Sequence, residues 1–181
     1  QYMQKKGMGV SNLHASHEAF YRRFGWECCG TPIRIICPVQ LLVNLGLKTT
    51  LPIRQMCIDH WPEFSDAYEK FAGNYSGMAI RKSFRWGFAL FGGGNPAHVL
   101  AAGDPVEAYA VVRMVPEVLG NTYGNWGEQQ IAEFVWATPE GHESLVSTFA
   151  GLAMNLSTLK WIEPFNGPFM SKYFTRGVTT Q

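Results

Sequence analysis

Residues 13–27 read LHASHEAFYRRFGWE, and they are the most informative stretch of this 181-residue chain. Ser16 belongs to the residue types that cap the start of a helix, and Gly25 is the residue type that most often ends one. The stretch therefore predicts a two-turn helix over His17–Phe24. Met8–Leu13, immediately before it, reads as a short strand.

The rest of the chain predicts a mixture of strands and helices. Further extended segments are expected at Trp26–Cys37, His98–Ala102, Ala108–Val115, Gln129–Ala137 and Thr158–Ile162. Gln1–Gly7 reads as the polar end of a helix that a glycine closes. Further helices are expected over Ile53–Trp61, from Ser65 through Phe71, over Met78–Phe91, and from Pro139 to about Leu156 after the cap Thr138. Leu41–Leu51 reads as a loop and Gly92–Pro96 as a turn. This order predicts the α+β class, with a mixed sheet and flanking helices.

The charge balance argues against nucleic acid or an anionic membrane surface as the main partner. The chain has 15 basic and 14 acidic residues, and its formal net charge is +1. It therefore has no excess of positive charge to match a phosphate backbone. No run approaches the roughly 18 apolar residues of a membrane-spanning helix. We expect neither nucleic acid nor a membrane among its partners.

The four cysteines do not have the spacing of a zinc site. They are Cys28, Cys29, Cys37 and Cys57. A structural zinc site needs paired ligands a few residues apart, with a second pair or histidines to match. We expect no metal, and we interpret the four residues as reduced structural cysteines of a cytoplasmic protein.

The part of the chain around residues 13–27 resembles the end of the GNAT acetyltransferase fold. A short strand is followed by a short helix that carries a Tyr, then by three residues, a Gly and an aromatic residue. The form Phe20-Tyr21-Arg22-Arg23-Phe24-Gly25-Trp26 resembles, within that superfamily, the enhanced intracellular survival family of bacterial N-acetyltransferases. Lys6–Ser11 looks like the coenzyme-binding helix entering the fifth strand. Three later features follow the order of that family's central domain. They are Arg81 with Trp86, the strand Glu107–Val111 and the strand Leu159–Trp161.

The resemblance implies two parts in the chain. Residues 1–37 would be the terminal strand, helix and strand of a truncated catalytic GNAT domain, and residues 38–181 a second GNAT-like domain without catalytic function. The chain begins with Gln1 rather than Met and ends without a closing element. We therefore expect a fragment of a longer protein, with residues 1 to about 31 poorly anchored and no activity in isolation.

The resemblance assigns Tyr21 the role of general acid. A tyrosine phenol, with an unperturbed pKa of about 10, is protonated at neutral pH. It can protonate the thiolate of coenzyme A while an amine displaces that thiolate from the acetyl group. The residues alone leave a second interpretation open, in which Tyr21 packs between Phe20 and Phe24 with its hydroxyl in solvent.

Acetyl-CoA is the co-substrate that the resemblance implies, held mainly by residues upstream of Gln1. His14 stands where related acetyltransferases often carry an Asn that touches the coenzyme, so it is a candidate cofactor-binding residue. The residues alone equally fit a partly exposed position at the entry to the helix. We expect His17 to be exposed. Trp86, Trp126 and Trp136 could line a substrate site or belong to the core, and they are not assigned.

The turn at residues 137–143, ATPEGHE, argues against a second coenzyme site. In the GNAT fold the pyrophosphate lies on backbone N–H groups at a glycine-rich helix start. This turn has one glycine, Pro139 has no N–H, and Glu140 and Glu143 add negative charge. Residues 38–181 are therefore expected not to bind acetyl-CoA.

The leading hypothesis is part of an enzyme that transfers acetyl groups to small-molecule or peptide amines. Aminoglycosides and lysine side chains are the substrates that the resemblance suggests, with a homo-oligomer as the full-length protein. The first alternative is a non-catalytic scaffold or interaction domain derived from the GNAT fold. A second is a single-domain acetyltransferase of another family, fused to an unrelated α+β module.

Overall fold

Hydrogen-bonded strands organise most of this chain around one sheet. The computed structural model describes residues 2–13, 15–30, 32–57, 60–91, 97–114, 127–154, 156–173 and 177–180. Residues 1–31 and 32–181 form two compact units. The second unit holds all the strands of the described residues.

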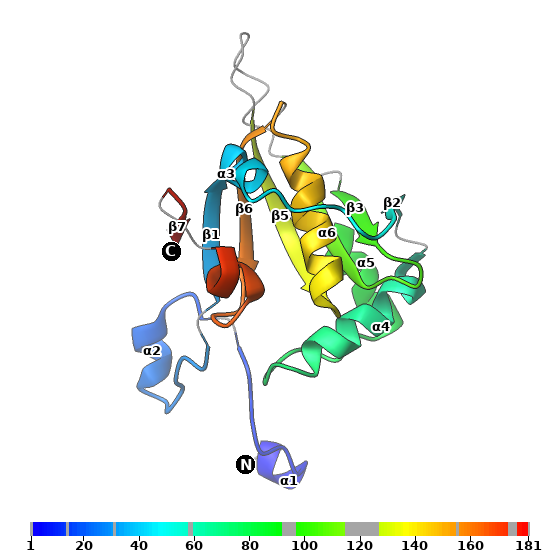
Figure 1. The fold of residues 1–181 in the computed structure, drawn as a ribbon. Helices are drawn as coiled ribbons and strands as arrows, with labels where there is room; N and C mark the ends of the chain where they lie inside the picture. Colours follow the sequence, from blue (N-terminus) through cyan, green and yellow to red (C-terminus); the bar gives the residue numbers. More distant parts are fainter. Residues whose placement is uncertain are drawn as a thin grey trace. The chain divides into compact units, whose positions relative to one another are not determined.

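The sheet of the second unit is mixed. Its strands are β1 (Ile33–Pro38), β2 (Ile53–Met56), β3 (Ala97–Ala102), β4 (Ala108–Met114), β5 (Gly127–Trp136), β6 (Leu156–Glu163) and β7 (Thr179–Thr180). Their order across the sheet is β2-β3-β4-β5-β6-β1-β7. All neighbours are antiparallel except β5 and β6, which are parallel. A parallel pair needs a crossover connection, and helix α6 (Pro139–Ala150) provides it (Figure 1).

Helices cover both faces of this sheet. Alternate residues of β4 divide between two buried clusters, because successive side chains of a strand point to opposite faces. Ala108 and Ala110 pack in the cluster that includes residues of α6 and of α3 (Val39–Asn44). Tyr109 and Val111 pack in the cluster formed with α4 (Trp61–Ala72) and α5 (Ser83–Phe91). The predicted α+β class, with a mixed sheet and flanking helices, is confirmed.

Helix α6 begins as the sequence predicts. The Thr138 hydroxyl accepts a hydrogen bond from the Gly141 N–H at 3.1 Å, and Pro139 occupies the first turn. Gly141 is required by close packing, because a Cβ there would lie 2.9 Å from the Ala108 Cβ. The helix ends at Ala150, six residues before the predicted Leu156, which starts β6 instead.

Strands β5 and β6 pair only near their amino-terminal ends in the described residues, where Gly127–Gln130 faces Leu156–Lys160. Beyond that point His142 of α6 fills the space beside β5, with its ring stacked on Phe134 at a centroid distance of 5.0 Å. The His142 Nε2 lies 3.1 Å from the Glu163 Oε1, and neither side chain is exposed to solvent.

Glu163 is a buried carboxylate that accepts three hydrogen bonds. Besides His142, the Trp161 Nε1 donates to Oε1 at 3.1 Å and the Phe169 backbone N–H donates to Oε2 at 3.3 Å. Phe169 begins a π-helical turn, η3 (Phe169–Tyr173). A buried charge is tolerated when donors satisfy its oxygens in this way.

Three segment predictions in the second unit were wrong. Ile53–Trp61 was predicted as a helix, but Ile53–Met56 is strand β2, paired with β3, and the helix starts at Trp61. The apolar spacing fits both structures, and pairing with a neighbouring strand decided the outcome. Ser65 lies inside α4 rather than at its cap, and donates to the Pro62 carbonyl. Helix α3 occupies part of the segment predicted as a loop.

Residues 1–31 form two short helices, α1 (Tyr2–Lys5) and α2 (Glu18–Arg22). Gly7 and Gly25 follow them with positive φ values of 67° and 83°, as the predicted glycine endings require. The strand predicted at Met8–Leu13 is wrong: these residues are irregular and pair with no strand among the described residues. The cap of α2 is His17 rather than Ser16, because the helix starts one residue later than predicted.

The boundary between the two units also differs from the predicted division at residues 37 and 38. The units divide after Thr31. The reason is that β1 pairs with β6 along its length, for example Ile35 with Trp161, and therefore belongs to the sheet of the second unit. None of the helices in the described ranges is long and apolar enough to cross a membrane.

The first unit has no buried residue among those described, whereas the second has two buried clusters. We predict that limited trypsin digestion cuts first after Arg22 or Arg23, because a segment without a core opens at little cost. Mass spectrometry of the early products tests this. Equally fast cleavage after Lys70 or Lys160, inside α4 and β6, would contradict the prediction.

We also predict that Glu163→Leu lowers the free energy of unfolding by about 3–5 kcal/mol, because it leaves three buried donors without their acceptor. Urea unfolding followed by circular dichroism measures the change. Glu69→Gln, at an exposed position of α4, is the control and should stay within about 0.5 kcal/mol of wild type. A similar small change for Glu163→Leu would show that the carboxylate is dispensable.

Candidate functional site

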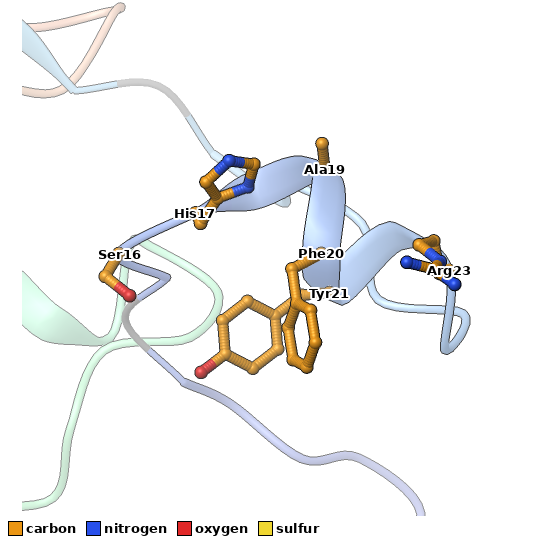
Figure 2. A pocket seen from close by; sticks show the side chains of 6 residues that line it. All are labelled: Ser16, His17, Ala19, Phe20, Tyr21 and Arg23. Atoms are coloured by element: carbon orange, nitrogen blue, oxygen red, sulfur yellow. The ribbon is translucent and has the colours of Figure 1, made fainter.

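Tyr21 lies beside an open hollow within residues 1–31. The residues that line the hollow are Ser16, His17, Ala19, Phe20, Tyr21 and Arg23 (Figure 2). Most of them belong to α2 or its immediate flanks, so a short local segment forms the whole hollow. Two exposed side chains that can carry positive charge, His17 and Arg23, line it together with an exposed aromatic ring, Phe20.

The Tyr21 side chain is half-buried and makes contacts with two other aromatic rings. Its ring meets Phe20 edge to face at a centroid distance of 5.3 Å, and Trp26 at 6.5 Å. Figure 2 shows the ring pointing away from α2 with its hydroxyl outermost. Among the described residues, none forms a hydrogen bond with this hydroxyl. The phenol is therefore without a protein partner among the described residues, and it lies at the hollow.

The other residues considered in the sequence have different places. His14, the candidate cofactor-binding residue, lies outside the described residues, as do Trp126 and the Gly92–Pro96 turn. Trp86 is 1% exposed and belongs to the core cluster of α4 and α5, and Trp136 is half-buried against the same cluster. His17 is exposed, as expected, and also lines the hollow beside Tyr21.

The start of α6 offers little to an anion. The Gly141 N–H bonds the Thr138 hydroxyl, and the His142 N–H bonds the Thr138 carbonyl at 3.2 Å. Pro139 has no N–H. The Glu107 carboxylate accepts a hydrogen bond from the Thr138 hydroxyl at 2.6 Å, which places a further negative charge at this helix start. A diphosphate would meet occupied donors and repulsion here.

The sequence did not reveal a polar network on the opposite face of the sheet. Arg81 donates to both oxygens of Glu133, at 2.7 and 2.8 Å, and its guanidinium lies 3.9 Å from the centre of the Tyr68 ring. The Tyr109 hydroxyl donates a short hydrogen bond to Glu133. The single signal that pointed here was the pairing of Arg81 with Trp86, whose ring centre is 5.0 Å from the guanidinium.

The groups of this network hold one another in fixed charge states. Burial and the Glu133 carboxylate raise the pKa of Tyr109 well above its usual value, so this phenol stays neutral. Burial opposes the charge of Arg81, but its hydrogen bonds to Glu133 and the charge of that carboxylate raise its pKa. A guanidinium engaged in this way is not free to bind a phosphate. Within the described ranges, no group of three or more His, Cys, Asp or Glu could hold a metal ion.

The solved structures with a similar fold include GCN5-related N-acetyltransferases and a protein described as a probable N-acyltransferase. A GCN5-related N-acetyltransferase from Anabaena variabilis aligns with 99% of this chain and 45% of its own, at 14% identity and a TM-score of 0.82. A probable N-acyltransferase of unknown function from Enterococcus faecalis aligns with the same shares, at 16% identity and a TM-score of 0.80. Eis1 from Mycobacterium abscessus aligns with 99% of this chain and 46% of its own, at 16% identity and a TM-score of 0.72.

The chain spans less than half of the length of these proteins. No model of a known protein family matches it, and no curated protein matches it in sequence. At such low identity the likeness concerns the fold. The chain therefore has the fold of part of a GCN5-related N-acetyltransferase.

Proposed function

We propose that the chain is part of an acetyl-CoA-dependent N-acetyltransferase of the enhanced intracellular survival type, acting on small-molecule or peptide amines. The observation that carries this proposal is the half-buried Tyr21 phenol at an open hollow, in a chain whose fold resembles GCN5-related N-acetyltransferases over 99% of its length. Aminoglycosides and lysine side chains are the amines that we propose to test first.

Tyr21 would act on the leaving group of the reaction. The amine nitrogen attacks the thioester carbonyl, the carbon–sulfur bond breaks, and the Tyr21 hydroxyl donates its proton to the sulfur that leaves. The hydroxyl has no protein acceptor among the described residues that would compete for this proton. The ring contacts with Phe20 and Trp26 restrict its direction, which a general acid requires.

We further propose that residues 32–181 contribute structure rather than coenzyme chemistry. Two observations support this view. At the start of α6 Pro139 has no N–H and the Gly141 N–H is engaged by Thr138, with the Glu107 carboxylate bonded to the same hydroxyl. The buried His142 ring stacks on Phe134 of β5 and contacts Glu163 of β6, so these groups are engaged with one another.

Replacing Tyr21 by Phe should reduce kcat for acetyl transfer by about 10²–10⁴-fold in the full-length protein, because the ring packing remains while the proton donor is lost. A panel of aminoglycosides and lysine peptides, assayed for thiol release from acetyl-CoA, measures the change. Tyr2→Phe is the matched control, since it removes the same atom from an exposed residue outside the hollow.

Two results would count against the proposal. Equal kcat for wild type and Tyr21→Phe would show that Tyr21 is not the general acid, but it would not contradict the proposed enzyme class. No transfer to any amine by a folded full-length protein would favour the alternative, a scaffold derived from the same fold.

Residues 1–181 alone should show no saturable binding of acetyl-CoA, because the start of α6 has few free donors and carries carboxylates. Isothermal titration with acetyl-CoA, alongside the full-length protein as the positive reference, tests this. Binding by residues 1–181 with an affinity similar to that of the full-length protein would place a coenzyme site within the chain and refute our view of α6.

A further inference from the structure

Cys57 and His60 form an exposed pair between two elements that are anchored in the core. The His60 Nδ1 lies 3.0 Å from the Cys57 Sγ. Strand β2 ends at Met56, one residue before the pair, and α4 begins at Trp61, one residue after it. Met56 and Phe64 are buried in the same cluster, so the two elements on either side of the pair are held together.

The backbone also fixes the geometry of the pair. The His60 N–H donates to the Cys57 carbonyl at 3.1 Å, which closes a turn. The Cys57 N–H lies 3.4 Å from the His60 Nδ1. Because a backbone N–H can only donate, Nδ1 acts as an acceptor in this contact, and the ring proton of neutral His60 lies on Nε2. Nδ1 is therefore the basic nitrogen, and it faces the thiol.

The other three cysteines have different partners. The thiols of Cys28 and Cys29 are exposed, but each donates to a backbone carbonyl, of Gly30 at 3.8 Å and of Glu27 at 3.4 Å. Cys37 is buried, and burial raises its pKa to about 11. A carbonyl oxygen accepts a hydrogen bond from a thiol but is too weak a base to take its proton, whereas an imidazole nitrogen can take it. Only the Cys57 thiol of these four residues therefore has a base as its partner.

We propose that Cys57 is a nucleophilic thiol that exchanges with low-molecular-weight disulfides, with His60 as its base. The His60 Nδ1 takes the thiol proton, and the Cys57 sulfur attacks one sulfur of the disulfide. The new sulfur–sulfur bond forms while the old one breaks, and the leaving thiolate takes up the proton. Cys57 ends as a mixed disulfide and one small thiol is released. This site is separate from Tyr21 and from the proposed acetyl transfer.

The test compares cysteines within the same molecule. The reduced chain is treated at neutral pH with bis(2-hydroxyethyl) disulfide, a neutral probe that local charges do not attract. Mass spectrometry of acid-quenched samples gives a rate of modification for each cysteine. We expect Cys57 to react at least about fivefold faster than Cys28 or Cys29, because the imidazole nitrogen beside its sulfur can take up the thiol proton as the sulfur attacks. Cys37 should be slowest.

Variants separate the effect of the base from that of exposure. His60→Ala should bring the Cys57 rate to within about twofold of Cys28 and Cys29. His60 makes no side-chain capping bond to α4, so the fold should persist, which circular dichroism checks. His98→Ala removes an exposed histidine that bonds Gln55 instead, and should leave the Cys57 rate unchanged. The proposal fails if Cys57 reacts no faster than Cys28 and Cys29, or if His60→Ala has no more effect than His98→Ala.

Discussion

One carboxylate without exposure to solvent, that of Glu163, links three parts of the second unit. Its oxygens accept from His142 in α6, from Trp161 in its own strand and from the backbone N–H of Phe169 in η3. Each donor would be costly to bury alone, and the carboxylate would be costly to bury without them. The crossover helix, the end of β6 and the segment after it are therefore held by one shared acceptor. Apolar burial supplies most of the stability, but this contact fixes how these elements meet.

The same contact bears on function. The His142 ring that contacts Glu163 of β6 also stacks on Phe134 of β5. A strand–helix–strand unit of this kind can hold a ligand only where backbone donors remain free, and here Thr138 and Pro139 leave few. The polar network of Arg81, Glu133 and Tyr109 on the other face is likewise closed on itself. The two groups on which the proposals rest, Tyr21 at the hollow and Cys57 after β2, lie outside both of these closed networks.

Prediction from the sequence succeeded where local signals were unambiguous. The strands β3, β4, β5 and β6 were found because their residues favour extended structure, and the cap of α6 because a Thr-Pro pair is typical of a helix start. Prediction failed at Ile53–Met56, because the spacing of its apolar residues also fits a helix and only the pairing with β3 makes it a strand. It also failed at α3, because this helix has no side-chain cap that the sequence could reveal. The strand expected at Met8–Leu13 was read from the residues alone. Strand structure requires a pairing partner, and these residues have none in the part of the chain that the structure describes.

The candidate sites divide in the same way. Tyr21 was proposed from its resemblance to a family motif, and its role as general acid stays a prediction. Arg81 and Glu133 are 52 positions apart and meet through tertiary structure, so no local pattern could indicate their contact. The pair of Cys57 and His60 was overlooked for another reason: the cysteines were considered for metal spacing, and two ligands do not make such a site.

The contact between Gly141 and β4 sets a limit on how this fold can evolve. The wall that a side chain at position 141 would meet includes the Glu107 backbone at 3.1 Å, as well as the Ala108 methyl group. Trimming Ala108 to glycine would therefore not create enough room, since a main chain cannot be made smaller. Homologous sequences should thus retain glycine here even when the solvent-facing residues of the helix have diverged completely. Any lineage that replaced it would have to move the helix outward from the sheet.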